Sequence, residues 1–89
     1  MSAEAARTAL GKDPASVTLA GDFNNWSPND AATACRLQDG VWTAVITLQP
    51  GKHTYKFVLD GGAKWKEDPS NSEKVDDGFG GSNSVVNVP

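Results

Sequence analysis

The stretch VWTAVITLQPGKHTYKFVLD, residues 41–60, decides the fold that this sequence predicts. Apolar and polar side chains alternate through 41–48 and again through 52–60, which is the pattern of β-strands with one buried face. Two sets of side chains would each share a face: Trp42, Ala44, Ile46 and Leu48 in the first run, and Tyr55, Phe57 and Leu59 in the second. Gln49-Pro50-Gly51 between the runs is typical of a tight turn, so they predict an antiparallel hairpin.

Shorter apolar runs on either side of this stretch predict further strands. They cover residues 16–22, 35–37 and 84–88, and the Asp-Gly pair at 39–40 favours a hairpin turn after the second of them. Glycine and proline recur at short intervals between the runs, as in β-sandwiches and barrels. The sequence therefore predicts one all-β domain, an antiparallel β-sandwich of roughly seven strands.

The first fourteen residues are ambiguous. The alanines over residues 3–10 favour a short helix by propensity, whereas 7–10 would equally suit a first edge strand. We expect an N-terminal arm or first edge strand over residues 1–14, followed by the sandwich domain over 15–89.

Charge and length exclude several classes of partner. The chain has 89 residues and a formal net charge of −3, and its lysines and arginines form no basic run. A phosphate backbone or an anionic membrane surface is therefore not expected as a partner. The length suits a single hydrophobic core.

The single cysteine, Cys35, points to a reducing compartment. It has no partner for an intrachain disulfide, whereas secreted domains of this size are often rich in disulfides. The first ten residues also lack the apolar centre of a signal peptide, so we expect a cytoplasmic protein. With one cysteine and one histidine, His53, no metal site or cofactor is expected.

Three residues fall outside the positions that the core requires. Trp26 lies in a turn-rich loop after a strand, Trp65 follows a glycine-rich turn, and Lys56 faces away from the core side of its strand. Each indole could simply fold back over an open end of the sandwich, and Lys56 could be an ordinary solvated charge. If the three share one surface, however, the indoles offer flat apolar faces to sugar rings and Lys56 offers hydrogen bonds.

The segments around these residues resemble carbohydrate-binding module family 48. The resemblance rests on Val17–Ser27, Gly51–Gly61, Trp65 with Asp68-Pro69, and Phe79–Val88, in the same order and with similar spacing. This family is the glycogen-binding, early-set type of immunoglobulin-like β-sandwich. It occurs in the β subunit of AMP-activated protein kinase and beside the catalytic domains of glycogen branching and debranching enzymes.

The resemblance implies non-catalytic binding of α-1,4-linked glucans such as glycogen, starch or maltooligosaccharides, with an enzyme of glycogen metabolism as a further partner. The positions of the family's binding residues fall on Trp26 and Trp65 for stacking, on Lys56 and Asn83 for hydrogen bonds, and on Phe79 for an apolar contact. Gly81 replaces a ligand-bonding threonine of the kinase subunit, and the turn before Trp65 is longer.

Two functions other than glucan binding would also suit a small β-sandwich, namely catalysis and protein interaction. A glycosidase requires a pair of carboxylates on a rigid frame, whereas the acidic residues at 67–77 cluster in a segment where Asp and Pro more simply make turns, so no enzyme is expected. The alternative to glucan binding is a protein-interaction or structural early-set module, because exposed aromatic residues also bind protein partners.

Overall fold

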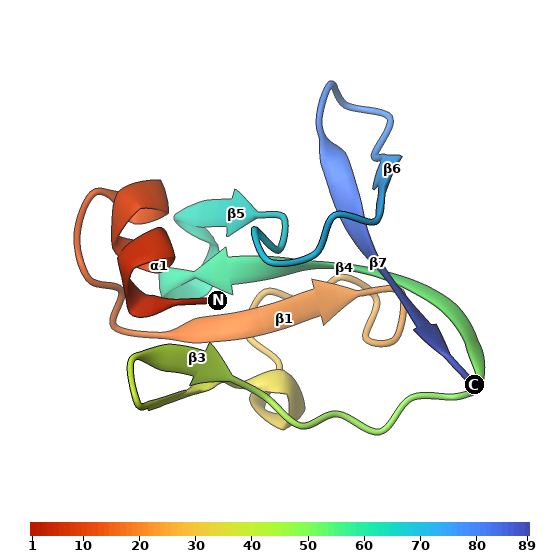
Figure 1. Ribbon diagram of the computed structural model, residues 1–89, viewed down its shortest axis with the longest axis horizontal. Coiled ribbons are helices and arrows are strands. Elements are labelled where there is room, and N and C mark those ends of the chain that lie inside the picture. The colour runs from red at the N-terminus through yellow and green to blue at the C-terminus, as the bar shows by residue number, and fades with distance from the viewer.

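The computed structural model describes all residues, 1–89, as an antiparallel β-structure with one helix (Figure 1). The helix is α1 (Ala3–Leu10), and two short 3-10 turns lie at Ala31–Thr33 and Asp60–Gly62. The strands are β1 (Val17–Gly21), β2 (Arg36–Gln38), β3 (Val41–Thr43), β4 (Gly51–Leu59), β5 (Lys64–Lys66), β6 (Lys74–Asp76) and β7 (Ser82–Val88). The expected all-β, immunoglobulin-like sandwich with about seven strands is confirmed.

The larger sheet is built around β4. Its strand order is β1-β4-β7-β6, with β5 also paired to β4, and the smaller sheet is the β2–β3 hairpin. In Figure 1 β3 lies on the other side of β1 from β4, while the loop between β6 and β7 projects from the body of the molecule. Asp39 and Gly40 form the β2–β3 turn with φ of 50° and 78°, the left-handed pair that a two-residue hairpin requires.

The predicted hairpin between 41–48 and 52–60 is wrong. Only Val41–Thr43 of the first run is a strand, and its partner is β2. Other strands pair with β4 instead: β1 with Tyr55–Leu59 on one edge, and on the other edge β7 with Gly51–Tyr55 and β5 with Phe57–Leu59. After β3 the chain runs along the rim to the far end before it turns back into β4 (Figure 1). Side chains still alternate along 41–48, half-buried and exposed in turn.

The expectation of an arm or edge strand over residues 1–14 is also wrong, because α1 occupies most of that segment. Ser2 caps the helix by accepting a hydrogen bond from the Ala5 N–H at 3.0 Å. At the other end Gly11 takes a left-handed conformation and donates its N–H to the Arg7 carbonyl. With eight residues, α1 is far shorter than a membrane-spanning helix.

The core lies between α1 and the inward face of the larger sheet. Its buried residues are Met1, Ala6, Val17, Phe57 and Leu59, and among the side chains packed against them are Leu19, Trp42 and Tyr55. The predicted inward face of β4 is therefore confirmed. Phe23 is only half-buried and lies outside this cluster, with its ring edge-on to His53 at a centroid distance of 6.4 Å.

Candidate functional site

One open pocket brings together every residue that the sequence singled out. It has a volume of about 330 Å³ and is lined by Trp26, Lys56, Trp65, Asp77, Phe79 and Asn83. These residues come from the loop after β1, from β4, from β5, and from the β6–β7 loop with the start of β7. The two indoles and the lysine thus share a surface, and neither indole packs into the core cluster.

The loop after β1 presents Trp26 in a constrained conformation. Asn25 and Trp26 both have left-handed backbone angles, with φ of 55° and 57°. For residues other than glycine this conformation costs about 1 kcal/mol each, so the surrounding contacts must hold it. The Trp26 N–H donates to the Gly21 carbonyl at 2.9 Å, which closes the turn.

The side chain of Asn24 connects the two sides of this loop through hydrogen bonds. Its Oδ1 accepts a hydrogen bond from the Gly21 N–H at 3.0 Å. Its Nδ2 donates to the Leu19 carbonyl at 3.1 Å and to the Asp30 carboxylate at 3.2 Å. A single amide therefore ties both sides of the loop together, which stabilises the position from which Trp26 leaves the chain.

Trp65 lies at the centre of β5, opposite Val58 of β4. The indole is 38 % exposed, whereas Val58 is fully buried. The turn that leads into β5 contains Gly61 with φ of 68°, and a Cβ there would lie 3.0 Å from the Asn29 side chain. The turn before Trp65 is thus fitted against the loop that carries Trp26, and despite its extra length both indoles reach the same pocket.

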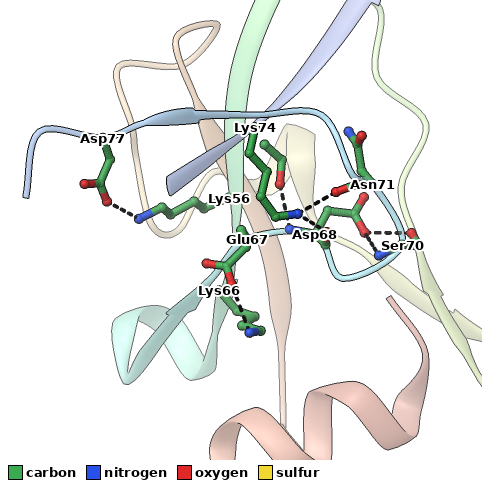
Figure 2. Close-up of polar contacts among 9 residues, drawn as sticks. Lys56, Lys66, Glu67, Asp68, Ser70, Asn71, Lys74 and Asp77 are labelled. Atoms are coloured by element: carbon green, nitrogen blue, oxygen red, sulfur yellow. Dashed lines mark hydrogen bonds and ion pairs between the residues drawn. The ribbon is translucent and has the colours of Figure 1, made fainter. Parts of the chain in front are cut away.

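A polar network fixes the chain just after β5 (Figure 2). Asp68 accepts hydrogen bonds from the Tyr55 hydroxyl at 2.8 Å and from the Ser70 N–H and hydroxyl, and its own N–H donates to the Ser84 hydroxyl at 2.7 Å. Asn71 donates to Tyr55 and to the Val85 carbonyl. Because these partners lie on β4 and β7, the chain that leaves β5 is anchored to the larger sheet.

Lys56 and Asp77 form an ion pair at the pocket, with 2.8 Å between Nζ and Oδ2 (Figure 2). Their side chains are 18 % and 11 % exposed. The hydrogen bond from Lys56, together with the backbone N–H groups of Phe79 and Gly81, lowers the pKa of Asp77 to about 2. The pocket therefore offers a fixed cation and a fixed anion side by side.

Phe79 and Asn83 complete the pocket from the β6–β7 loop and β7. Phe79 is 93 % exposed at the tip of the loop. Asn83 is half-buried opposite Val75 of β6 and lines the pocket, where an amide can both donate and accept hydrogen bonds.

Asp77 is the pocket residue that the sequence did not single out. The sequence predicts a turn at this position, and Asp77 does make one, because its Oδ1 accepts hydrogen bonds from the Phe79 N–H at 2.7 Å and from the Gly81 N–H at 3.0 Å. Its second oxygen, however, faces Lys56. The only local hint that Asp77 belongs to the pocket is its place two residues before Phe79. Its pairing with Lys56 spans twenty-one positions of the chain, so no local pattern indicates it.

His53 fastens the start of the Trp26 loop to β4. Its Nδ1 lies 2.9 Å from Asp22 Oδ1 and its Nε2 lies 2.7 Å from the Gln49 carbonyl oxygen. Both partners are acceptors, so only the protonated ring can donate to both. The Gln49 carbonyl, followed by Asp22, accordingly raises the pKa of His53 above its ordinary 6.5.

This clamp predicts a pH-dependent stability. A raised folded-state pKa means that the stabilisation is fully present below pH 6.5 and is lost as the pH rises through the folded value. We expect the melting temperature of the wild type to fall over this range more than that of His53→Gln, measured by circular dichroism. An NMR titration of His53 with a pKa at or below 6.5 would contradict the clamp.

The family described as the glycogen recognition site of AMP-activated protein kinase matches residues 11–89 of the chain. The chain belongs to this family, and the resemblance to carbohydrate-binding module family 48 is confirmed.

Curated relatives are similar to the chain over most of its length. The β-1 subunit of 5′-AMP-activated protein kinase is 35 % identical over 72 residues in Sus scrofa and 38 % in Rattus norvegicus. These matches cover 81 % of this chain, but only 53 % and 24 % of the two relatives. Protein PTST homolog 2, chloroplastic, of Arabidopsis thaliana is 38 % identical over 60 % of this chain and 9 % of its own length.

Proposed function

We propose that this module binds α-1,4-linked glucan chains, such as glycogen, starch or maltooligosaccharides, without acting on them. The observation that carries the proposal is the convergence of Trp26, Trp65 and Lys56 on one open pocket. A sugar ring has apolar faces and a rim of hydroxyl groups. The two indoles suit the apolar faces, and the lysine, which is held on β4, suits the hydroxyl groups. Membership of a glycogen-recognition family supports the same ligand class.

Each residue has a distinct part in the proposed complex. Trp26 and Trp65 stack on glucose rings and remove their apolar faces from water. Lys56 donates from β4, and the Asn83 amide both donates and accepts. Phe79, at the tip of its loop, contacts the ligand from the remaining side. The strain at Trp26 is consistent with such a role, because strained backbone clusters at ligand sites.

The chemistry of the pocket supports binding without catalysis. A glycosidase uses two carboxyl groups, one of which must carry a proton to the leaving group. Asp77 is the only carboxylate that lines this pocket, and its pKa of about 2 keeps it unprotonated. Neither a second carboxylate nor a proton donor of the required kind faces the ligand space.

The setting of the module is also a proposal. The chain spans 53 % or less of the length of the kinase subunits and of the chloroplast protein to which it is similar. We propose that it localises a partner enzyme of glycogen metabolism to glucan in the cytoplasm. The unpaired Cys35, whose pKa burial raises to about 11, agrees with a thiol that stays reduced there.

The test of glucan binding is a titration of the wild-type chain with maltoheptaose and β-cyclodextrin, monitored by tryptophan fluorescence and by NMR shifts. We expect saturable changes at Trp26 and Trp65, and none with cellohexaose, whose β-linked rings lie along a flat ribbon. No response to maltoheptaose at millimolar concentration would refute the proposal.

Protein interaction is a second candidate, favoured by apolar side chains exposed away from the pocket. Leu37, Val41 and Val45, on the β2–β3 hairpin and its continuation, are 52 %, 43 % and 93 % exposed. None of them lines the pocket that contains Trp26 and Trp65. Protein interaction would be supported if Val45→Asp disrupts association with a partner enzyme while the affinity for glucan stays unchanged.

A further inference from the structure

Asp77 lines the pocket next to Lys56, but the glucan contacts proposed above give it no part. We propose that Asp77 makes the pocket selective for uncharged glucan chains, because it cancels the charge of Lys56 and repels anionic sugar groups. The inference rests on the proposed function and adds to it a specificity-determining residue and the class of ligand that is excluded.

The first support is the charge of the pocket lining. Lys56 and Asp77 are the only charged residues among the six that line it, and their charges cancel. Lys64 and Lys66 flank Trp65, but side chains alternate along a strand, so they leave β5 on the opposite face. Neither of them lines the pocket. An anionic sugar would thus find no uncompensated cation there.

The second support is that Asp77 is held in its place and in its ionised form. The backbone N–H groups of Phe79 and Gly81 donate to Oδ1, and Lys56 donates to Oδ2. These donors lower the pKa of the carboxyl to about 2, so the negative charge is present throughout the neutral range. The side chain is 11 % exposed, and bulk water therefore screens this charge only partly.

The third support is the fit between Asp77 and Gly81. A Cβ at position 81 would lie 2.9 Å from Asp77 Oδ2, closer than such atoms approach in proteins. The glycine thus makes room for the carboxylate beside Lys56. A larger residue at 81 would push Asp77 away from the ion pair and change the charge that the ligand meets.

The ion pair suits hydroxyl groups in particular. Lys56 has three N–H donors and gives one to Asp77, and the carboxylate has further lone pairs. A sugar hydroxyl both donates and accepts, so it can bond to the lysine and the aspartate together. An ionised phosphate or carboxylate group only accepts hydrogen bonds. Beside Asp77 it would have no proton to donate to the aspartate, and the two negative charges would repel each other.

The test compares Asp77→Asn with Asp76→Asn. In the first variant the amide Oδ1 can still accept from Phe79 and Gly81, so the loop keeps its turn while the charge is lost. The second variant removes the same charge from a neighbour that bonds only the Gly78 N–H and does not line the pocket. Calorimetry at low ionic strength measures Kd for maltoheptaose and for 6-phosphorylated maltoheptaose with each protein.

We expect the wild type to prefer the uncharged ligand, and Asp77→Asn to shift the ratio of the two Kd values toward the phosphorylated one by about tenfold. Asp76→Asn should leave the ratio unchanged. An unchanged ratio in Asp77→Asn, or an equal shift in Asp76→Asn, would overturn the selectivity while maltoheptaose binding stands. A wild type that binds neither ligand would overturn the proposed function as well.

If Asp77→Asn does not give a folded NMR spectrum, salt provides the second measurement on the wild type. Raising the ionic strength from about 0.02 M to about 0.5 M shortens the Debye length severalfold and weakens the repulsion. The phosphorylated ligand should then gain affinity relative to maltoheptaose. A relative loss of affinity with salt would mean that attraction to Lys56 dominates, which contradicts the inference.

Discussion

Replacing Trp26 or Trp65 by alanine is expected to weaken maltoheptaose binding by about thirtyfold, and replacing both is expected to abolish it. A stacked indole removes about 80 Å² of apolar surface from water, which at about 25 cal/mol per Å² is worth about 2 kcal/mol. Isothermal titration calorimetry or NMR shift mapping measures the loss. Trp65→Tyr should retain part of the affinity, because it keeps an aromatic face at the same place on β5.

The control for this experiment is Leu37→Ala. Leu37 is an exposed apolar residue on β2 that does not line the pocket, so its removal should leave Kd unchanged. Neither indole belongs to the core cluster, and both alanine variants should therefore remain folded. Full binding by the double variant would show that the indoles are not the stacking platforms.

The second large effect is expected on stability. Leu59→Ala should lower the free energy of unfolding by about 3–4 kcal/mol, because the transfer free energy is lost and a cavity remains. Leu59 is fully buried in a core cluster of only five buried residues. A domain of this size has about 5–13 kcal/mol in total, so the variant should melt about 15–25 °C lower.

Leu37→Ala is the matched control here too, since it makes the same chemical change at a side chain that is 52 % exposed. Its free energy of unfolding should change by no more than about 0.5 kcal/mol. Urea denaturation followed by circular dichroism measures both variants. A loss for Leu59→Ala no larger than that for Leu37→Ala would place the core elsewhere.

Local pattern was sufficient for features that depend only on a residue and its near neighbours in sequence, such as the buried face of a strand or a tight turn. Alternation identified the inward residues Phe57 and Leu59 of β4, and the Asp39-Gly40 pair identified the β2–β3 turn. It failed for the helix because the alanines, the Ser2 cap and the left-handed Gly11 act together, and each signal by itself was weak. The propensity of the alanines favoured the correct element.

Local sequence pattern could not predict which strands that are distant in sequence pair with each other. The run 41–48 alternates as a strand should, but alternation says only which side chains are buried and nothing about which strand lies alongside. Strand β7, some thirty positions later, pairs with Gly51–Tyr55, the half of β4 that follows the predicted turn. Backbone hydrogen bonds carry little sequence information, so the choice of partner depends on how all the strands fit together.

The sequence by itself determined the fold class and the inward face of β4, because residue type and spacing carry that information, and its resemblance to a known family indicated the five residues proposed to bind glucan. Only the tertiary structure decided that these residues meet in one pocket, since the loop after β1, the strand β5 and the β6–β7 loop converge through long-range pairing. It also added Asp77, whose part depends on a charge contact with Lys56 that no local pattern encodes.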